Sequence, residues 1–163
     1  MKNIFSYQTV IGRISIVEEN NHITNIFFEN DTLPLEAGNS KEYPVKESET
    51  IKEAGCQLNE YLEGRLQVFN LPLKPEGTEF MQNVWKSLQD IPYGSTKSYK
   101  DIAKAVGSEK ACRAVGLANN RNPIPIFIPC HRVIGTNGKL VGYRGGLETK
   151  LKLLEMERRH GSI

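Results

Sequence analysis

Two prolines near the middle of the chain limit its fold more than any other feature. Pro72 and Pro75 stand in the segment Leu71-Pro72-Leu73-Lys74-Pro75, and each favours extended backbone in the residue before it. The charge changes sign at the same place. Residues 1–75 hold 7 Lys and Arg against 11 Asp and Glu, a net charge of −4, whereas residues 76–163 hold 14 against 8, a net charge of +6. We therefore predict two small domains, 1–75 and 76–163, joined by a short linker.

The first domain is predicted to be α/β, with a short antiparallel sheet and one helix. Three runs rich in β-branched and aromatic residues predict strands at 4–9, 13–17 and 22–28. Residues 30–45 are polar, contain two prolines and predict a loop. A helix is predicted to follow and to stop at Gly64. Its apolar face consists of Ile51, Ala54, Leu58, Tyr61 and Leu62.

The second domain is predicted to be mostly helical. Thr78 can cap a helix that ends before Pro92. A glycine-rich hairpin is predicted over residues 135–146. The last helix then presents a leucine face and stops at Gly161. That face consists of Leu147, Leu151 and Leu154.

A helix-turn-helix is predicted inside this second domain. Ser98 and Asp101 have the spacing of a capping box for its first helix. Ser108 follows Gly107 and is expected to cap the second helix. The second helix is slim, because its residues include Ala111, Ala114, Gly116 and Ala118. A slim helix fits either a narrow DNA groove or tight helix packing, and the pattern alone favours neither.

Cysteine and histidine are few and scattered. The three cysteines are Cys56, Cys112 and Cys130, and the chain has only three histidines. Their spacing predicts neither a disulfide framework nor a metal site, and Cys112 is interpreted as a small packing residue. No apolar run approaches the roughly 20 residues of a membrane span, and polar residues interrupt the N-terminus. We expect a cytoplasmic protein, or a nuclear one in a eukaryote, that does not bind membranes.

Cys130 stands between an apolar, proline-stiffened segment and two basic residues. The segment 124–129 contains two prolines, a third, Pro123, stands directly before it, and the segment is predicted to be extended. His131 and Arg132 follow the cysteine, and basic neighbours lower the pKa of a thiol and so activate it as a nucleophile. A cysteine after an apolar segment is more often a buried core residue, and adjacent side chains in extended backbone point to opposite faces. If His131 is the base, a turn or a bridging water must connect it to Cys130.

The longer sequence around Cys130 resembles a known family. NPIPIFIPCHRV (122–133) is similar to the active-site signature of the O6-alkylguanine-DNA alkyltransferases, also called methylated-DNA–protein-cysteine methyltransferases. The resemblance continues through GTEFMQNVWKSLQDIPYGSTKSYKDIAKAVG (77–107), CRAVGLANN (112–120) and GYRGGLETKLKLLEMER (142–158). The N-terminal part matches more loosely, in QLNEYLEGRLQVFNLPL (57–73). The resemblance implies a ribonuclease-H-like first domain and a second domain with a winged helix-turn-helix.

The resemblance also implies a reaction, namely single-turnover DNA repair. Cys130 accepts an alkyl group from O6-alkylguanine, with O4-alkylthymine as a second candidate substrate. His131 acts through a water as the base, and Glu157 orients His131. Asn122 braces the loop that holds the nucleophile, and Tyr99 donates its hydroxyl to the guanine ring.

Further residues are assigned by the same resemblance to DNA and to the base. The lesion base is flipped out of double-stranded DNA that is bound through the minor groove, and Arg113 enters the gap. The expected protein is a monomer without cofactor. The other DNA-binding residues implied are Ser98, Ala111, Ala114 and Gly116. The implied base pocket consists of Pro125, Val133, Tyr143 and the backbone of Arg144.

Pattern alone leaves other roles open for several of these residues. Tyr99 lies on the apolar side of its helix and fits a core residue. Arg113 fits a solvated charge, and Asn122 fits an ordinary turn residue. Glu155 and Glu157 flank opposite sides of the leucine face, so periodicity does not choose between them, whereas the motif favours Glu157.

Three other functions compete with alkyl transfer. A lesion-binding relative without enzymatic activity would lack the acceptor cysteine, but Cys130 is present. A transcription regulator would need side chains that read base edges on its recognition helix, and alanine and glycine supply few. A cysteine hydrolase would need an oxyanion hole, and no such motif is recognised.

Overall fold

The structure of the protein is a computed structural model that describes residues 2–38 and 40–161. The chain divides into two compact units, Met1–Pro75 and Glu76–Ile163. Each unit has its own set of buried apolar side chains.

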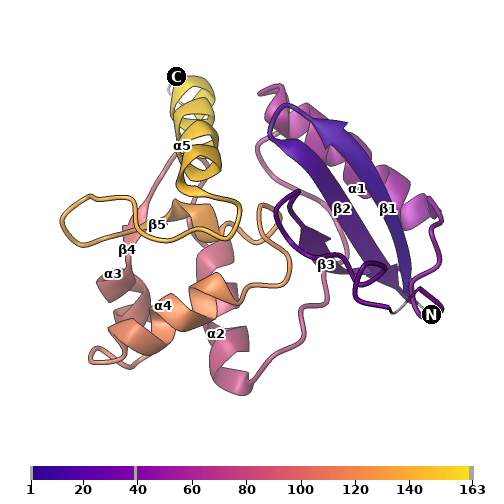
Figure 1. Ribbon diagram of the computed structural model, residues 1–163. Coiled ribbons are helices and arrows are strands. Elements are labelled where there is room, and N and C mark those ends of the chain that lie inside the picture. Colours follow the sequence, from indigo (N-terminus) through magenta and orange to yellow (C-terminus); the bar gives the residue numbers. More distant parts are fainter. Residues whose placement is uncertain (1, 39, 162–163) are drawn as a thin grey trace. The chain divides into compact units, whose positions relative to one another are not determined.

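An antiparallel three-stranded sheet forms the first unit together with one helix (Figure 1). Its strands are β1 (Asn3–Thr9), β2 (Gly12–Glu19) and β3 (His22–Phe27), in that spatial order. Asn20 and Asn21 connect β2 to β3 with φ of 52° and 63°, and asparagine tolerates this left-handed conformation better than most residues. The three predicted strands are therefore confirmed, with β2 longer than expected at both ends.

The helix of this unit, α1 (Glu49–Leu62), packs on the sheet through the predicted face. Ser48 caps it by accepting a hydrogen bond from the Ile51 backbone N–H. The proline-rich segment after α1 is extended as predicted but is bound to the sheet. Ile23 N donates to Pro72 O at 2.7 Å, and Lys74 N donates to Ile23 O at 2.8 Å. These residues therefore belong to the first unit and do not form a free linker.

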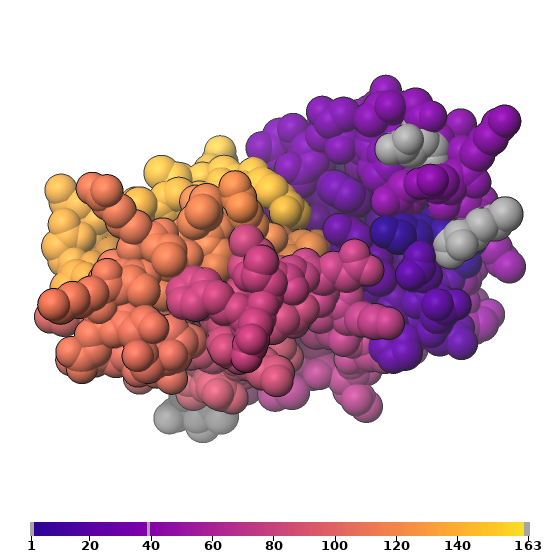
Figure 2. Space-filling model, turned by 90° about the horizontal axis from the view of Figure 1, so that it is seen from below, coloured from indigo at the N-terminus to yellow at the C-terminus, as the bar shows by residue number. Residues whose placement is uncertain are grey.

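Three helices pack together in the second unit. They are α2 (Glu79–Gln89), α3 (Tyr99–Ala105) and α4 (Cys112–Asn120), and each contacts the other two. The pink surface of α2 and the orange surface of the α4 region adjoin in Figure 2. Thr78 caps α2, and Ser98 and Asp101 form the predicted capping box of α3. The buried Trp85 links α2 to α4, because its Nε1 donates to Ala118 O at 2.9 Å.

The second helix of the helix-turn-helix begins later than predicted. Ser108 does not cap it, because the N-cap position of α4 lies three residues further on, at Ala111. Ser108 instead belongs to the end of α3, where its backbone N–H donates to Ala103 O at 2.9 Å. The Ser108 carbonyl accepts from Ala111 N at 2.8 Å. Ala111 is thus the N-cap residue of α4, without a side-chain hydrogen bond, and not a member of the helix. Cys112 is exposed, so its interpretation as a packing residue was wrong.

A short parallel strand pair joins β4 (Lys97–Ser98) to β5 (Val133–Ile134). The described residues 135–146 form a loop and not the expected hairpin. A turn in this loop is closed by the hydrogen bond from Gly135 N to Lys139 O at 2.8 Å.

The last helix, α5 (Leu147–Gly161), buries a different face from the predicted one. Leu147 and Leu151 are 48% and 42% exposed. Two of the buried residues are charged, and each of them has hydrogen-bonding partners that offset the cost of burial. The buried residues of α5 are Lys150, Leu153, Leu154, Met156 and Glu157.

Candidate active site

Cys130 lies at the start of a short 3-10 helix, η1 (Cys130–Arg132), and only 4% of its surface is exposed. The segment before it is folded into tight turns and is not extended. Phe127 N donates to Pro125 O at 2.9 Å across Ile126, whose φ is +75°. This is the rare γ-turn of positive φ, and a strained residue of this kind costs on the order of 1–3 kcal/mol.

A second γ-turn delivers the sulfur. Pro129 has φ −79° and ψ 64°, and Cys130 N donates to Ile128 O at 2.8 Å. These values describe the common inverse γ-turn, which the proline ring favours because it fixes φ. The prolines therefore stiffen the approach to Cys130 as predicted, but they do so in turns.

Two buried asparagines hold this turn segment. Asn122 Nδ2 donates to Ile128 O at 2.9 Å, and Asn122 Oδ1 accepts from Ile124 N at 3.0 Å. Asn119 Nδ2 donates to the carbonyl of Cys130 itself at 3.3 Å. Asn122 thus has the bracing position that the resemblance implied. Asn119 was not predicted, because its partner lies 11 residues away in a segment that only the folded chain brings close.

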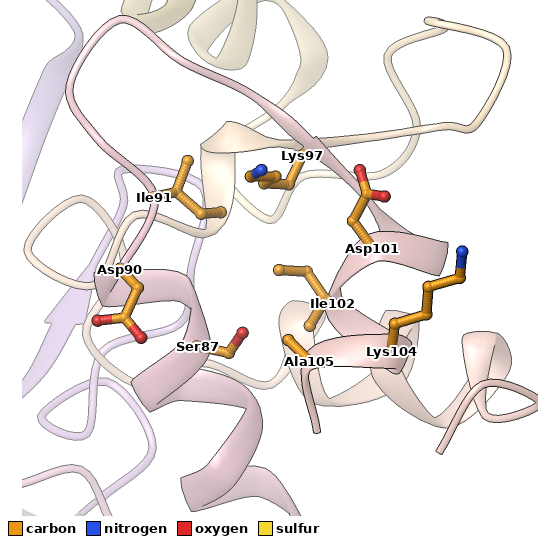
Figure 3. Close-up of a pocket in the computed structure, with 8 residues that line it drawn as sticks. All are labelled: Ser87, Asp90, Ile91, Lys97, Asp101, Ile102, Lys104 and Ala105. Carbon is orange, nitrogen blue, oxygen red and sulfur yellow. The ribbon is translucent and has the colours of Figure 1, made fainter. Parts of the chain in front are cut away.

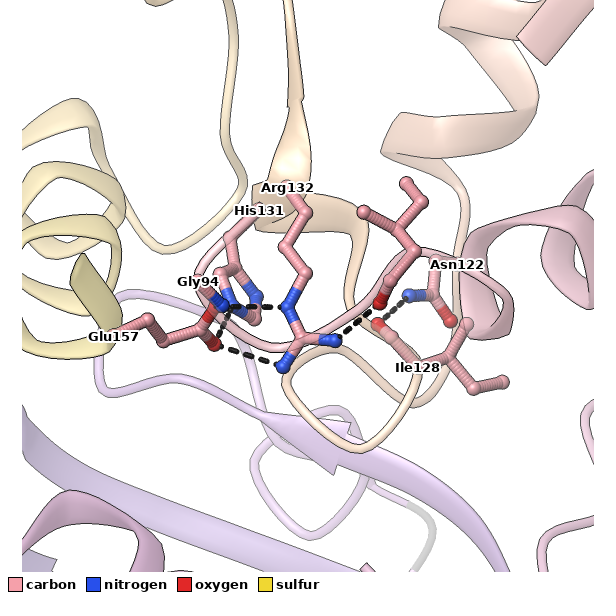
Figure 4. A network of polar contacts seen from close by, with 7 residues as sticks. Gly94, Asn122, Ile128, His131, Arg132 and Glu157 are labelled. Carbon is pink, nitrogen blue, oxygen red and sulfur yellow. Dashed lines mark hydrogen bonds and ion pairs between the residues drawn. The ribbon is translucent and has the colours of Figure 1, made fainter. Parts of the chain in front are cut away.

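His131, Arg132 and Glu157 form a buried polar network (Figure 4). His131 Nε2 lies 2.7 Å from Glu157 Oε2. Arg132 donates from Nε to Glu157 Oε1 at 2.8 Å and from Nη2 to Oε2 at 3.0 Å. Gly94 N also donates to Oε1, at 3.2 Å. The carboxylate is therefore held from three sides, and the choice between Glu155 and Glu157 falls on the buried Glu157, since Glu155 is exposed.

Arg132 has a different task from the one its sequence position suggested. We expected it beside the thiol, but its guanidinium pairs with Glu157, and its Nη1 donates to Ile91 O at 2.7 Å. The pairing is a two-pronged contact that suits the planar guanidinium. Arg132 therefore fixes the carboxylate that holds His131.

Burial and charge set the protonation states of this network. Burial would raise the pKa of Glu157, but hydrogen bonds from His131 and Arg132, together with the positive charge of Arg132, prevail and lower it to about 2. Burial lowers the pKa of His131 despite the neighbouring Glu157, so the imidazole is neutral at pH 7. With Nε2–H donating to the carboxylate, a neutral ring carries its lone pair at Nδ1, where it can accept a proton.

The pKa of the Cys130 thiol is shifted in opposite directions by its surroundings. Burial raises its pKa, whereas a hydrogen bond from Asn122 and the positive charges of Arg144 and Lys150 lower it. The cations that act on the sulfur thus come from the 135–146 loop and from α5. They are not the basic neighbours in the sequence.

Comparison with known proteins places this arrangement in a family. Residues 5–75 match the family described as "6-O-methylguanine DNA methyltransferase, ribonuclease-like domain", and residues 79–159 match its "DNA binding domain". A methylated-DNA–protein-cysteine methyltransferase of Methanosarcina acetivorans is 46% identical over 151 residues, which cover 93% of this chain and 95% of that protein. The constitutive enzyme of that name from Bacillus subtilis is 47% identical over 152 residues, 93% of this chain and 92% of that protein. The chain belongs to the methylated-DNA–protein-cysteine methyltransferase family.

Solved structures agree with this membership and with the predicted fold class. The O6-methylguanine methyltransferase of Mycobacterium tuberculosis is 40% identical, with a TM-score of 0.89, and covers 98% of this chain and 94% of that one. A structure of the same protein in complex with DNA has a TM-score of 0.88 at 40% identity, covering 97% and 94%. A small sheet domain and a helical domain are therefore both confirmed for this member of the methyltransferase family.

An open groove of about 290 Å³ is lined by residues of α3, α4 and the 135–146 loop in this methyltransferase family member. It brings together three of the residues assigned by resemblance, namely Tyr99 of α3 with Arg113 and the half-buried Gly116 of α4. Tyr99 is half-buried at the start of α3, and its hydroxyl donates to Val141 O at 3.3 Å. The groove is lined by Tyr99, Cys112, Arg113, Gly116, Asn120, Val141 and Gly142.

The remaining predicted residues are not among those that line this groove. Pro125 and Val133 are buried in the turn segment and in β5, and Tyr143 is half-buried in the loop. Burial raises the pKa of Tyr143 well above its usual value. The resemblance implied a role only for the backbone of Arg144, but its side chain also makes a contact, because Nη1 donates to Asn122 O at 3.1 Å. Among the predicted DNA-binding residues, Ala114 is exposed, whereas the Ser98 hydroxyl is engaged in capping α3.

A second hollow on the same unit has a larger volume, about 450 Å³, but contains none of the predicted site residues (Figure 3). It lies between α2 and α3 and has two carboxylates and two ammonium groups on its rim. We assign it no role, since its size is the only feature that favours it. Among the described residues, no group of three or more His, Cys, Asp or Glu is placed to hold a metal ion. In the same residues, no helix has both the length and the apolar character to cross a membrane.

Proposed function

We propose that this chain repairs DNA by transferring the alkyl group of O6-alkylguanine to Sγ of Cys130. One observation carries the proposal. The buried Cys130 shares a 3-10 turn with His131, whose Nε2 lies 2.7 Å from Glu157, in a domain that matches the DNA-binding domain of the family. O4-alkylthymine is a second candidate substrate of the same site.

The proposed transfer is a single displacement. His131 takes the thiol proton through a water molecule, and the sulfur attacks the alkyl carbon. The S–C bond forms as the C–O6 bond breaks, and the electron pair of that bond stays on guanine. The hydroxyl of Tyr99 then supplies a proton to the guanine ring. This scheme needs no metal or organic cofactor, because the DNA brings the transferred group and the protein holds its acceptor.

The incoming base must change one hydrogen bond that the structure contains. The Tyr99 hydroxyl donates to Val141 O, so the guanine ring has to take the place of that carbonyl. The base can reach this point only after it is flipped out of the duplex, because stacking shields its O6 edge. The proposed pocket for the flipped base is lined by Val133, Tyr143, Pro125 and the backbone of Arg144.

We propose that α4 enters the minor groove. Its residues Arg113 and Ala114 are consecutive and both exposed, and alanine keeps the helix slim beside the arginine. Arg113 can fill the gap left by the flipped base, while Ala111, Gly116 and Ser98 lie nearby along the helix-turn-helix. We propose that the protein acts as a monomer where the DNA is, in the cytoplasm or in the nucleus of a eukaryote.

Transfer of label tests the proposed function. The protein is mixed with duplex DNA that carries radiolabelled O6-methylguanine, and digested protein is analysed for the modified residue. We expect label on Cys130, with a burst of at most one methyl group per protein molecule and no turnover afterwards. Tight binding of the DNA without covalent label would instead indicate a lesion-binding protein, and label on Cys56 or Cys112 would refute the assignment of the acceptor.

Removal of the Arg113 side chain should separate flipping from chemistry. Flipping a base costs a few kcal/mol, and free O6-benzylguanine needs no flipping. Arg113→Ala should therefore slow repair of duplex DNA by about tenfold or more relative to its effect on the free base.

The matched control is Arg121→Ala, which removes an exposed positive charge at the other end of α4. This control should weaken DNA binding in a salt-dependent way without a specific loss of flipping. Equal slowing of duplex and free base by Arg113→Ala would show that Arg113 serves the fold or the thiol.

A further inference from the structure

Lys150 is a fully buried lysine next to the site, and the mechanism above does not use it. Lys150 has no exposed surface, although the exposed Leu147 lies about one turn before it on α5 and the exposed Leu151 follows it directly. Lysine is almost never fully buried unless it is paired, because removing an ammonium group from water is costly. The chain therefore bears a cost at this position that polar partners must offset.

The partners of Lys150 are two backbone carbonyls, one from the proposed base pocket and one from the groove that Tyr99 lines. Its Nζ donates to Val133 O at 2.7 Å and to Val141 O at 3.0 Å. Val133 begins β5, directly after the 3-10 turn of Cys130, and Val141 belongs to the 135–146 loop. One ammonium group thus ties the strand that follows the nucleophile to the loop that borders the groove.

The same carbonyl of Val141 also accepts the hydrogen bond from Tyr99. Lys150 and Tyr99 therefore meet at a single oxygen atom, from α5 and from α3. When guanine takes the Tyr99 hydroxyl, Lys150 still holds Val141 O in place, so the loop need not move as the base enters.

Charge connects Lys150 to the sulfur as well. Burial lowers the pKa of Lys150 to about 8, and the negative charge of the Cys130 thiolate acts in the opposite direction. The other titratable groups that act on or are affected by this sulfur are Tyr99 from α3 and Tyr143 and Arg144 from the loop. The neighbouring His131 is neutral, and Arg132 is engaged by Glu157. Lys150 and the half-buried Arg144 thus supply the positive charge at the thiol.

We propose that Lys150 is a positioning residue for alkyl transfer, which holds the Val133 and Val141 carbonyls at the base pocket and favours the thiolate of Cys130. The inference rests on the proposed function for its first half. Its second half concerns the thiol alone and can be tested with a reagent that needs neither DNA nor a guanine base.

The test uses Lys150→Met, because methionine is similarly long and unbranched but carries no donor and no charge. All variants are made with Cys56→Ser and Cys112→Ser, so that Cys130 is the sole thiol. The rate of alkylation by iodoacetamide is measured from pH 6 to 10.5 by mass spectrometry. Loss of a close cation shifts a thiol pKa upward by about one unit or more, so we expect the midpoint of the profile to rise by that amount.

Transfer from O6-benzylguanine over the same pH range tests the first half. We expect Lys150→Met to raise the midpoint here too, and also to lower the rate at the high-pH plateau by about tenfold. At the plateau the thiolate is fully formed in every variant, so a lower rate there reflects the displacement of the Val133 and Val141 carbonyls and not a change in the thiol pKa. An unchanged midpoint with both reagents and an unchanged plateau would overturn the proposal.

Two control variants on α5 separate this role from a general effect on the fold. Lys152→Met removes an exposed charge and should leave both profiles unchanged. Leu153→Ala removes a buried apolar side chain and should lower thermal stability without moving the midpoint. A midpoint shift in Leu153→Ala equal to that in Lys150→Met would overturn the proposal. If wild-type protein shows no transfer from benzylguanine or methylated DNA, the proposed function fails, whereas the iodoacetamide profile still decides the effect of Lys150 on the thiol.

Discussion

Cys130→Ser abolishes transfer of the alkyl group to protein and leaves DNA binding intact: this is the largest effect we expect on activity. A thiolate is the attacking species, and a serine hydroxyl at neutral pH forms almost no alkoxide. The substitution changes one buried atom to a smaller one, and the turn that carries residue 130 is held by backbone contacts and by Asn119 and Asn122. The fold and the α4 surface should therefore persist.

Two measurements check this result. Label transfer from O6-methylguanine DNA should fall to background, whereas the affinity for the same duplex should stay within about threefold of wild type, which corresponds to less than about 0.7 kcal/mol. Cys56→Ser and Cys112→Ser serve as matched controls, since both residues are exposed, and each should transfer as fast as wild type. Residual label in Cys130→Ser that maps to another cysteine would contradict the assignment.

The largest expected effect on stability is that of Glu157→Gln. This change keeps the shape of the side chain but removes the negative charge that faces the buried Arg132. Removing one partner of a buried ion pair typically costs about 3–5 kcal/mol, a large part of the roughly 5–15 kcal/mol that stabilises a small protein. Urea unfolding should show this loss, and transfer should be slower because His131 loses the carboxylate that orients it.

The pH dependence of that loss has a defined sign. The pKa of Glu157 is about 2 in the folded protein against an ordinary value of 4.5, so its contribution to stability is fully present above about pH 4.5. It is lost as the pH falls from there towards 2. The stability difference between wild type and Glu157→Gln should therefore be constant near neutrality and shrink below about pH 4.5. A difference that grows in acid would contradict the depressed pKa.

Glu155→Gln is the matched control, because Glu155 is exposed on the same helix two residues earlier. It should change stability by no more than about 0.5 kcal/mol. The double variant Arg132→Met with Glu157→Gln should be more stable than the sum of the two single changes predicts, by about 1–3 kcal/mol, because the residues interact directly. Additive losses would mean that the ion pair contributes little.

Local features of the fold could be predicted from the sequence because their causes lie within a few residues. Thr78 and the Ser98–Asp101 pair cap α2 and α3 as predicted, since a cap needs only a side chain and the backbone three residues away. The strands of the first unit were predicted for the same reason, from alternation and turn residues. Ser108 shows the limit of such reasoning. Its position after Gly107 suggested the start of the next helix, but in the fold its backbone N–H closes the end of α3.

The prediction of the buried face of α5 was wrong because hydrophobic periodicity counts apolar side chains only. Lys150 and Glu157 are buried by partners that lie 17 and 25–26 residues away in the chain, and no local pattern contains those partners. The same cause explains why Asn119 and Lys150 were not recognised as parts of the site, and why Arg132 was expected at the thiol and not at Glu157. The motif around Cys130 identified which residues to expect there, whereas the cations that act on the sulfur depend on tertiary contacts.

The burial of Cys130 also bears on how long an unused molecule keeps its capacity. Oxidation of a thiol depends on exposure and on the thiolate fraction, and at Cys130 only 4% of the surface is exposed while burial raises the pKa. Cys56 and Cys112 are exposed and meet oxidants and small electrophiles first. A protein that the proposed reaction uses only once must keep its acceptor thiol reduced until it meets a lesion. Here the acceptor Cys130 is buried, whereas the exposed Cys56 and Cys112 react first with oxidants and electrophiles in solution. The number of protein molecules able to accept an alkyl group should then decrease mainly with the number of lesions repaired, and much less through slow oxidation of Cys130.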